Sequence, residues 1–178
     1  MYRSSKSHFF LLNDLSAIGV DCKKATRPCP CAYQGQERCH CSSEQVQRYR
    51  NRISGPLLDR IDIQIEVPAV PVGELQQRNG GERSDAVRAR VAAARGRMLE
   101  RQGKSNSMLQ PFELDSLCSV DESAAALLRQ ATAKLGLSAR SYHRALKVAR
   151  SIADLAGVPA ITGAHVAEAL GYRRRVDG

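Results

Sequence analysis

Four cysteines in one short stretch are the residues of this sequence best suited to bind a metal ion. Cys29, Cys31, Cys39 and Cys41 form two Cys-x-Cys pairs that seven residues separate. Zinc prefers a tetrahedron of thiolate or imidazole ligands, and two short ligand pairs across a turn supply one. We expect a structural zinc ion here, because four protein ligands would leave no open position for catalysis.

Two alternatives to this four-cysteine site remain open on the residues alone. His40 could replace one sulfur as a ligand, and the four thiols could be reduced and carry no metal. Cys22 and Cys118 lie outside the pattern, and we expect them to pack as small hydrophobic side chains.

The chain is strongly basic, and arginine supplies most of the charge. Its net charge is +9, from 27 lysine and arginine residues against 18 acidic ones, and 21 of the 27 are arginine. The planar guanidinium group fits phosphates well, so a nucleotide or a nucleic acid is the favoured partner class. A basic balance that serves only solubility is the alternative.

Nothing in the sequence predicts membrane insertion or export. No apolar run approaches the roughly 20 residues of a membrane span. The apolar run Phe9–Leu12 is shorter than the roughly 7–15 residues at the centre of a signal peptide. We therefore expect a cytoplasmic protein, whose thiols stay reduced.

Two segments could aim arginines at a phosphate. In the helix expected at residues 138–157, Arg140, Arg144 and Lys147 share one face near the N-terminus, where the helix dipole favours an anion. A solvated basic face would show the same pattern. In the other segment, Arg60 follows a Gly-Pro turn and two leucines and directly precedes a strand.

The elements that position these residues form a small mixed front part and a helical back part. Alternation of apolar and polar residues predicts a strand at Ile61–Val67, while residues 1–26 show no clean period. The polar, Gly-rich residues 76–83 form the best boundary. Helices are expected at residues 42–52, where Ser42 and Gln45 form a capping box and Val46, Tyr49 and Ile53 face inward, and from a cap at Ser84 to a stop at residues 103–107. Further helices are expected at 111–118, from a cap at Asp121 to about 134 with Gly136 as its stop, at 138–157, which Ser138 begins and Gly157 helps to end, and from a cap at Thr162 to about 172. The predicted fold class is α+β, mainly α.

Three stretches of the chain, in the same order, resemble one family. They are "RPCPC…CHCSSEQVQRYRNRISGPLLDRID", "RISGPLLDRIDIQIEVPAV" and "GLSARSYHRALKVARSIADLAG". They resemble the C-terminal part of the magnesium-chelatase-like AAA+ ATPases of the ComM/YifB family. The resemblance implies that residues 27–75 are the end of an AAA+ α/β core with one clear strand and the cysteine insert. Residues 84–178 would be the helical lid, and residues 1–26 match nothing in the family.

The resemblance also implies roles for the arginines. Arg60 matches the arginine finger, which reaches the γ-phosphate of ATP bound by a neighbouring subunit and can raise the rate by several powers of ten. Arg140 matches the sensor-2 arginine of the lid, and Arg144 lies one turn further on. The family implies ATP with Mg²⁺ as cofactor, a homo-hexameric ring, and DNA as partner, in branch migration during natural transformation.

The chain departs from the family in several places. It contains no G-x-x-x-x-G-K-[ST] motif and no acidic Walker B strand, so it lacks the ATP pocket. Arg27 stands where the family usually has asparagine, and Ala32 where it commonly has glycine. We expect a C-terminal fragment that is inactive alone and places Arg60 and Arg140 on ATP bound by a full-length or split partner.

Two other functions compete with this expectation. One is a small zinc-containing basic DNA-binding protein, although the chain has few aromatic residues for base stacking. The other is a lid-only module that docks on a full-length family member.

Overall fold

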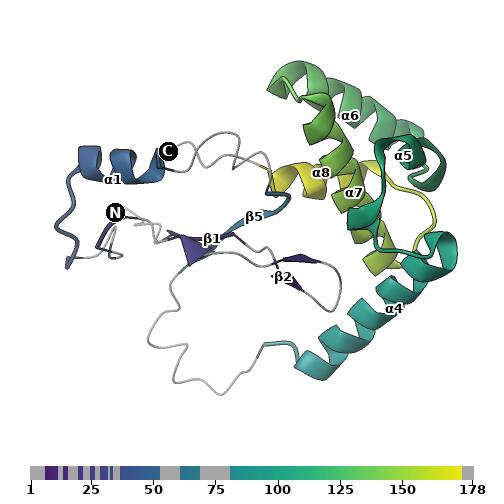
Figure 1. Ribbon diagram of the computed structural model, residues 1–178, viewed down its shortest axis with the longest axis horizontal. Coiled ribbons are helices and arrows are strands. Elements are labelled where there is room, and N and C mark those ends of the chain that lie inside the picture. Colours follow the sequence, from purple (N-terminus) through teal and green to yellow (C-terminus); the bar gives the residue numbers. More distant parts are fainter. Residues whose placement is uncertain are drawn as a thin grey trace. The chain divides into compact units, whose positions relative to one another are not determined.

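The computed structural model describes residues 7–11, 14–15, 20–21, 25–26, 29–31, 33, 37–52, 61–68 and 81–173. The chain divides into two compact units, one of Met1–Leu15 with Asp21–Gly80 and one of Ser16–Val20 with Gly81–Gly178. The fold is α+β and mainly helical, as the sequence predicts (Figure 1).

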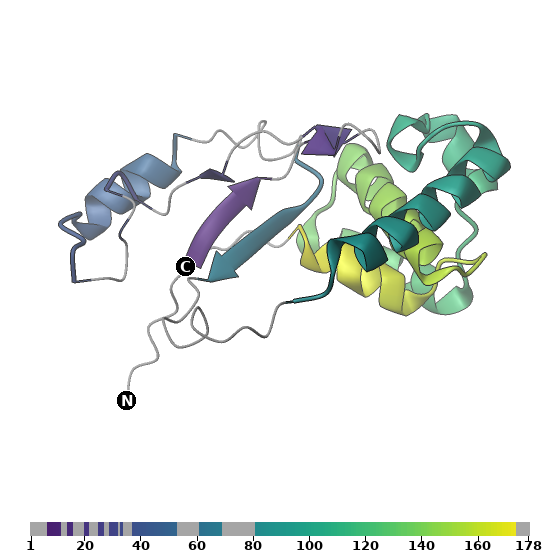
Figure 2. The same ribbon diagram turned by 90° about the horizontal axis from the view of Figure 1, so that it is seen from below.

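A three-stranded antiparallel sheet lies in the first unit. Strand β1 (Ser7–Leu11) pairs with β4 (Ala25–Thr26) on one side and with β5 (Gln64–Pro68) on the other. Figure 2 shows β1 and β5 side by side. In the register of this antiparallel pair, Phe9 of β1 lies opposite Glu66 of β5. A separate two-stranded sheet joins β2 (Asp14–Leu15) and β3 (Val20–Asp21).

Strand β5 confirms the strand predicted at Ile61–Val67, with its start displaced to Gln64. Ile61 precedes the strand and is buried. Strand β1 was not predicted, because Phe9, Phe10 and Leu11 follow one another without alternation. Pairing with β5, far along the chain, defines this strand, and local pattern alone seldom reveals such pairing.

Helix α1 (Ser43–Arg50) begins where its cap was predicted. Ser42 and Gln45 form a capping box, in which the N–H of Gln45 donates to Oγ of Ser42 at 3.2 Å and the N–H of Ser42 donates to Oε1 of Gln45 at 2.9 Å. Val46 is buried and Tyr49 half-buried, as expected, while Ile53 lies outside the described residues.

The second unit is a helical bundle with α7 (Ala139–Ala156) packed against several neighbours. Helix α7 contacts α4, η1, α5 and α8, and α8 also contacts α6. Three alanines of α7 that are at most 1% exposed, Ala145, Ala149 and Ala153, let these neighbours approach closely. The neighbours of α7 are α4 (Ser84–Gln102), η1 (Asn106–Met108), α5 (Pro111–Leu117) and α8 (Gly163–Gly171), and the helix packed on α8 is α6 (Glu122–Leu135).

Local signals begin and end most of these helices as predicted. The Asp121 carboxylate accepts a hydrogen bond from the N–H of Ala124 at 2.7 Å and caps the start of α6. Oγ of Ser138 accepts one from the N–H of Ser141 at 3.2 Å and caps the start of α7. Gly136 and Gly157 follow α6 and α7 with φ of 58° and 76°, a left-handed conformation that costs glycine little.

The cap predicted at Ser84 is wrong. Ser84 is the first residue of α4, and Arg83 stands at the N-cap without a side-chain hydrogen bond to the helix. Instead, the Asp85 carboxylate accepts from the Arg83 guanidinium and from the N–H of Ala86. A carboxylate in the first turn also suits the helix dipole, so the serine is not needed as a cap.

Candidate functional site

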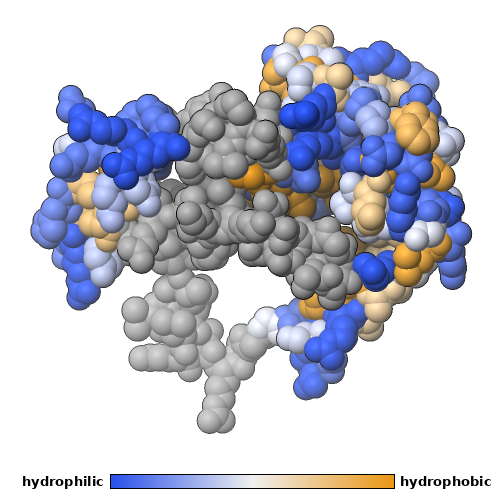
Figure 3. All heavy atoms as spheres, in the orientation of Figure 1, coloured by the Kyte–Doolittle hydropathy of each residue, from blue (hydrophilic) through white to orange (hydrophobic). Residues whose placement is uncertain are grey.

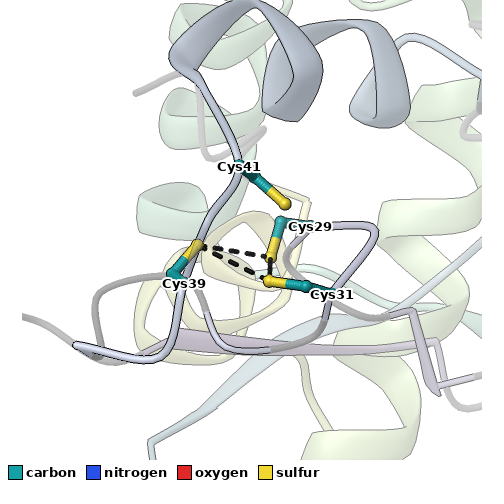
Figure 4. Close-up of side chains that lie close together, drawn as sticks. All are labelled: Cys29, Cys31, Cys39 and Cys41. Atoms are coloured by element: carbon teal, nitrogen blue, oxygen red, sulfur yellow. Dashed lines mark hydrogen bonds between the residues drawn. The ribbon is translucent and has the colours of Figure 1, made fainter.

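The structure brings the four predicted cysteines together. Sγ of Cys29 lies 3.3 Å from Sγ of Cys31 and 3.9 Å from that of Cys39, and the latter two are 3.6 Å apart. The four sulfur atoms, with Cys41, all lie within 4.8 Å of one another and could hold a metal ion (Figure 4). Cys29 is buried and the other three are half-buried.

The thiols differ in how readily they lose a proton. A backbone hydrogen bond at Tyr33 and the sulfur contacts with Cys29, Cys41 and Cys39 lower the pKa of Cys31 to about 6, against partial burial. A backbone hydrogen bond at Cys31 also favours the thiolate of Cys41. The pKa of Cys41 is nevertheless raised to about 11, because the sulfur of Cys31, partial burial and the nearby Cys29 outweigh this hydrogen bond. The thiolate of Cys31 therefore forms easily at neutral pH, whereas Cys41 would need a nearby cation to lose its proton.

The surroundings of the cluster bear on the two alternatives. His40 is exposed and is not one of the four grouped ligands, so the sulfurs converge without it. Cys118 lies at the end of α5, where burial raises its pKa to about 11 despite the nearby Arg150 and Arg101. It packs as the small hydrophobic residue that was expected. Cys22 lies outside the described residues.

The predicted basic face of α7 begins in the first turn of the helix. Arg140 is exposed and makes no hydrogen bond or ion pair within the described part of the chain, while Arg144, one turn further on, is half-buried. Lys147 donates to the carbonyl of Ser107 at 3.2 Å, which ties the same face to η1. Arg140 is thus the residue of this face best placed to meet a phosphate.

A buried charged network lies further along the same face of α7, towards its C-terminus. Asp154 and Arg150 are each 1% exposed and form an ion pair of 3.0 Å. Arg101 of α4 holds both carboxylate oxygens of Asp154, at 2.7 and 2.9 Å, and Asn106 donates to the same group at 2.8 Å. Arg150 also donates to the carbonyls of Val158 and Pro159. The network joins α4, η1, α7 and the segment after α7.

Sequence reasoning missed this network. Its one local signal is an opposite-charge pair, Arg150 and Asp154, at the i, i+4 spacing on the face that also carries Lys147. The partner Arg101 lies 53 residues away from Asp154 along the chain, and no local pattern reveals it.

The family comparison covers both units. The profile of the family described as "Magnesium chelatase, subunit ChlI C-terminal" matches residues 81–173, more than half of the chain. This chain belongs to that family. The profile "Magnesium chelatase, subunit ChlI" matches residues 19–75 of this magnesium chelatase family member, so the match begins inside the segment 1–26 that was expected to match nothing in the family. The predicted membership in the ComM/YifB group is confirmed.

Curated relatives support the same membership. The chain is 46% identical over 153 residues to "Competence protein ComM" of Haemophilus influenzae and 43% identical over 151 residues to "Uncharacterized protein YifB" of Escherichia coli K12. An uncharacterized protein of Mycobacterium tuberculosis CDC 1551 is 34% identical over 154 residues. These matches cover 84–85% of this chain and 30% of each relative, so the chain spans about 30% of the relatives' length.

Other sequence predictions for this magnesium chelatase family member lie outside the described residues. They concern Arg60, Arg27 and Ala32, which the structure does not place. Within the described residues, no helix has the length and apolar character needed to cross a membrane.

Proposed function

We propose that this chain supplies the end of an AAA+ core and its helical lid to an ATPase whose nucleotide another chain binds. Residues 27–75 would be the end of the core and residues 84–178 the lid. The observation that carries the proposal is the family match over residues 81–173 together with Arg140 in the first turn of α7, which is exposed and has no hydrogen-bond or ion-pair partner among the described residues. Because the sequence lacks a P-loop, ATP and Mg²⁺ must be held elsewhere.

In this proposal the arginines act on charge that another chain positions. Arg60 is the arginine finger, which stabilises the negative charge that builds up on the γ-phosphate during transfer. Arg140 is the sensor-2 arginine, and Arg144 supports the same positive face one turn further on. The N-terminus of α7 adds the partial positive charge of the helix dipole at the same end. Such sharing of a site between chains implies an oligomeric ring, for which we propose the hexamer of the family.

We propose DNA as the substrate on which the assembled ATPase acts. The support is the likeness to a competence protein and the net charge of +9. Branch migration during natural transformation is the specific reaction we propose, in the cytoplasm. The backbone charge of DNA is the feature that an arginine-rich surface recognises, so binding should weaken steeply as salt rises and should not depend on sequence.

We further propose that the cysteine cluster holds zinc. In a tetrahedral zinc site with Zn–S bonds of about 2.3 Å, neighbouring sulfurs are about 3.8 Å apart. The three Sγ–Sγ distances of 3.3, 3.9 and 3.6 Å lie around that value. Four thiolates also suit zinc better than the oxygen-preferring Mg²⁺.

The cysteine cluster also favours one competing function, a small zinc-containing DNA-binding protein. Arg38, Arg48 and Arg52 are exposed beside the cluster and along α1, and could contact phosphates. A strong preference of the chain for one DNA sequence in competition binding would favour this function over the ATPase module. For a lid-only role, this chain should co-purify with a full-length family member. That co-purification should require residues 81–173 of this chain but not Arg60.

The proposal is tested by measuring ATP binding and hydrolysis with the purified chain and with a P-loop-bearing ComM-family member. We expect the chain alone to bind ATP no better than a protein without a nucleotide site and to show no turnover. When mixed, the two chains should form one assembly by light scattering. ATP hydrolysis by the chain alone would contradict the proposed division of labour.

A further inference from the structure

The segment that carries the cysteines has almost nothing but the cysteines to hold it. Its described residues, 29–31, 33 and 37–41, form turns and bends but no helix or strand. Between residues 29 and 52, Cys29 and Val46 are the buried side chains among those described. A segment with so little apolar burial does not order itself through a hydrophobic core.

Helix α1 follows this segment and is weak by itself. It has eight residues, whereas isolated helices shorter than about 12–15 residues are marginal in water. Val46 is its one buried residue, and Figure 3 shows mainly hydrophilic side chains over it. Its capping box therefore needs another group to hold the backbone at the start of the helix.

The fourth cysteine lies directly at that start. Cys41 is adjacent to Ser42, whose extended backbone (φ −69°, ψ 160°) aligns the capping box. Its Sγ lies in the same group as Sγ of Cys29, twelve residues earlier in the chain. A bond from each sulfur to one ion would fix both ends of the loop and the first residue of the helix together.

We infer that a zinc ion bound by Cys29, Cys31, Cys39 and Cys41 orders α1, so that this helix forms in the metal-loaded chain and melts when the metal is removed. The inference rests on the proposed zinc but not on the ATPase role. On loading, each thiol that is still protonated releases its proton as its sulfur bonds to zinc, and removal of zinc reverses this step. The ion therefore stands in for a hydrophobic core, to which the described residues between 29 and 52 contribute only Cys29 and Val46.

The test is hydrogen exchange of the full chain with zinc and after a strong chelator, combined with zinc content by mass spectrometry. We expect one zinc per chain. After chelation, exchange at residues 43–50 should accelerate about tenfold or more, because loss of the metal releases the helix start. Residues 139–156 of α7 serve as the internal reference and should keep their protection.

Matched alanine variants separate the ligands from other cysteines. Cys39→Ala should lose zinc and the protection of α1 together, while Cys118→Ala, a cysteine outside the cluster, should keep both. His40→Ala should also keep both, and loss of zinc in that variant would overturn the four-thiolate ligand set. Replacing zinc with Co²⁺ should give the visible absorption of a tetrahedral thiolate site.

Two negative results are distinguishable. If zinc binds but residues 43–50 exchange equally fast with and without it, the metal site stands and its role in ordering α1 is overturned. If the chain binds no zinc, the metal proposal itself fails, and the inference fails with it. Neither result would bear on ATP hydrolysis in the mixed assembly.

Discussion

At the residue scale, the buried Asp154 is the residue on which donors from α4, η1 and α7 converge. Arg101, Arg150 and Asn106 all donate to its carboxylate, which is 1% exposed. Two buried ions of opposite charge gain little over apolar residues, but removing one of them leaves the other without compensation. Asp154 should therefore matter more to stability than any surface ion pair of the bundle.

The first prediction concerns the Asp154→Asn variant. It keeps the shape of the side chain but leaves the Arg150 guanidinium buried without a counter-charge, so the free energy of unfolding should fall by about 3–5 kcal/mol. Urea denaturation followed by circular dichroism measures this. The matched control is Glu82→Gln, which breaks the exposed pair with Arg90 and should cost at most about 1 kcal/mol. Equal costs for the two variants would contradict the role of the network.

The second prediction is the pH dependence of the same residue. Burial raises the pKa of Asp154, but hydrogen bonds from Arg101 and Asn106 and the charge of Arg150 outweigh it and hold the pKa below its usual range. A lowered pKa in the folded state stabilises the fold above the unfolded value of about 3.9. This stability is lost as the pH falls through the folded value. The stability difference between the wild type and Asp154→Asn should therefore shrink below about pH 4, and a constant difference would contradict the assignment.

At the element scale, local chemistry explains why so many helix ends could be predicted. A cap such as Ser42, Asp121 or Ser138 acts within four residues, and so does a left-handed glycine after a helix. The prediction failed at Ser84, which is already the first helical residue, while Arg83 stands at the N-cap without a side-chain hydrogen bond to the helix. It also failed at β1, which depends on a partner strand more than fifty residues away.

The third prediction compares two serines. Ser138→Ala removes the acceptor for the N–H of Ser141 at the start of α7 and should destabilise the bundle by about 1 kcal/mol. Ser84→Ala removes no cap and should change the stability by less than about 0.5 kcal/mol. Thermal denaturation of both variants measures the contrast. A larger loss for Ser84→Ala would restore Ser84 as the cap of α4.

The fourth prediction compares two glycines. Gly157 has φ of 76°, and a Cβ there would lie 3.1 Å from Nη2 of Arg97, so Gly157→Ala should destabilise the bundle by about 1 kcal/mol or more. Gly96 lies inside α4 with open space around it, and Gly96→Ala should stabilise the helix by about 0.5–1 kcal/mol. Chemical denaturation should therefore move the two midpoints in opposite directions. Two shifts of the same sign would contradict this.

At the scale of the whole molecule, the convergence of the four cysteines was predicted from their spacing, but the distances between them were not. Spacing indicated two ligand pairs, whereas the approach of Cys29 to Cys39 within 3.9 Å depends on how the loop between them folds. The exposure of Arg140 followed from its place in the first turn of α7. The role of Arg60 remains a prediction, because this residue lies outside the described part of the chain.

The whole chain makes sense as one part of a shared site. It has an exposed arginine at a helix N-terminus and belongs to the magnesium chelatase family, yet its sequence has no P-loop. These arginines can act only on ATP that residues outside this sequence bind, and we propose that another chain supplies those residues. This division between chains is the central claim of the account.

The most direct test is ATP hydrolysis by a P-loop-bearing ComM-family member whose own finger and sensor-2 arginines are replaced by alanine, measured with and without this chain. Addition of the wild-type chain should restore turnover by at least about tenfold, since an arginine supplied in trans is worth several powers of ten in related phosphoryl transfer. Arg60→Ala and Arg140→Ala should abolish the rescue, while Arg129→Ala, an exposed arginine of α6, should preserve it. Equal rescue by all of these variants, or no rescue by the wild-type chain in a formed assembly, would contradict the claim.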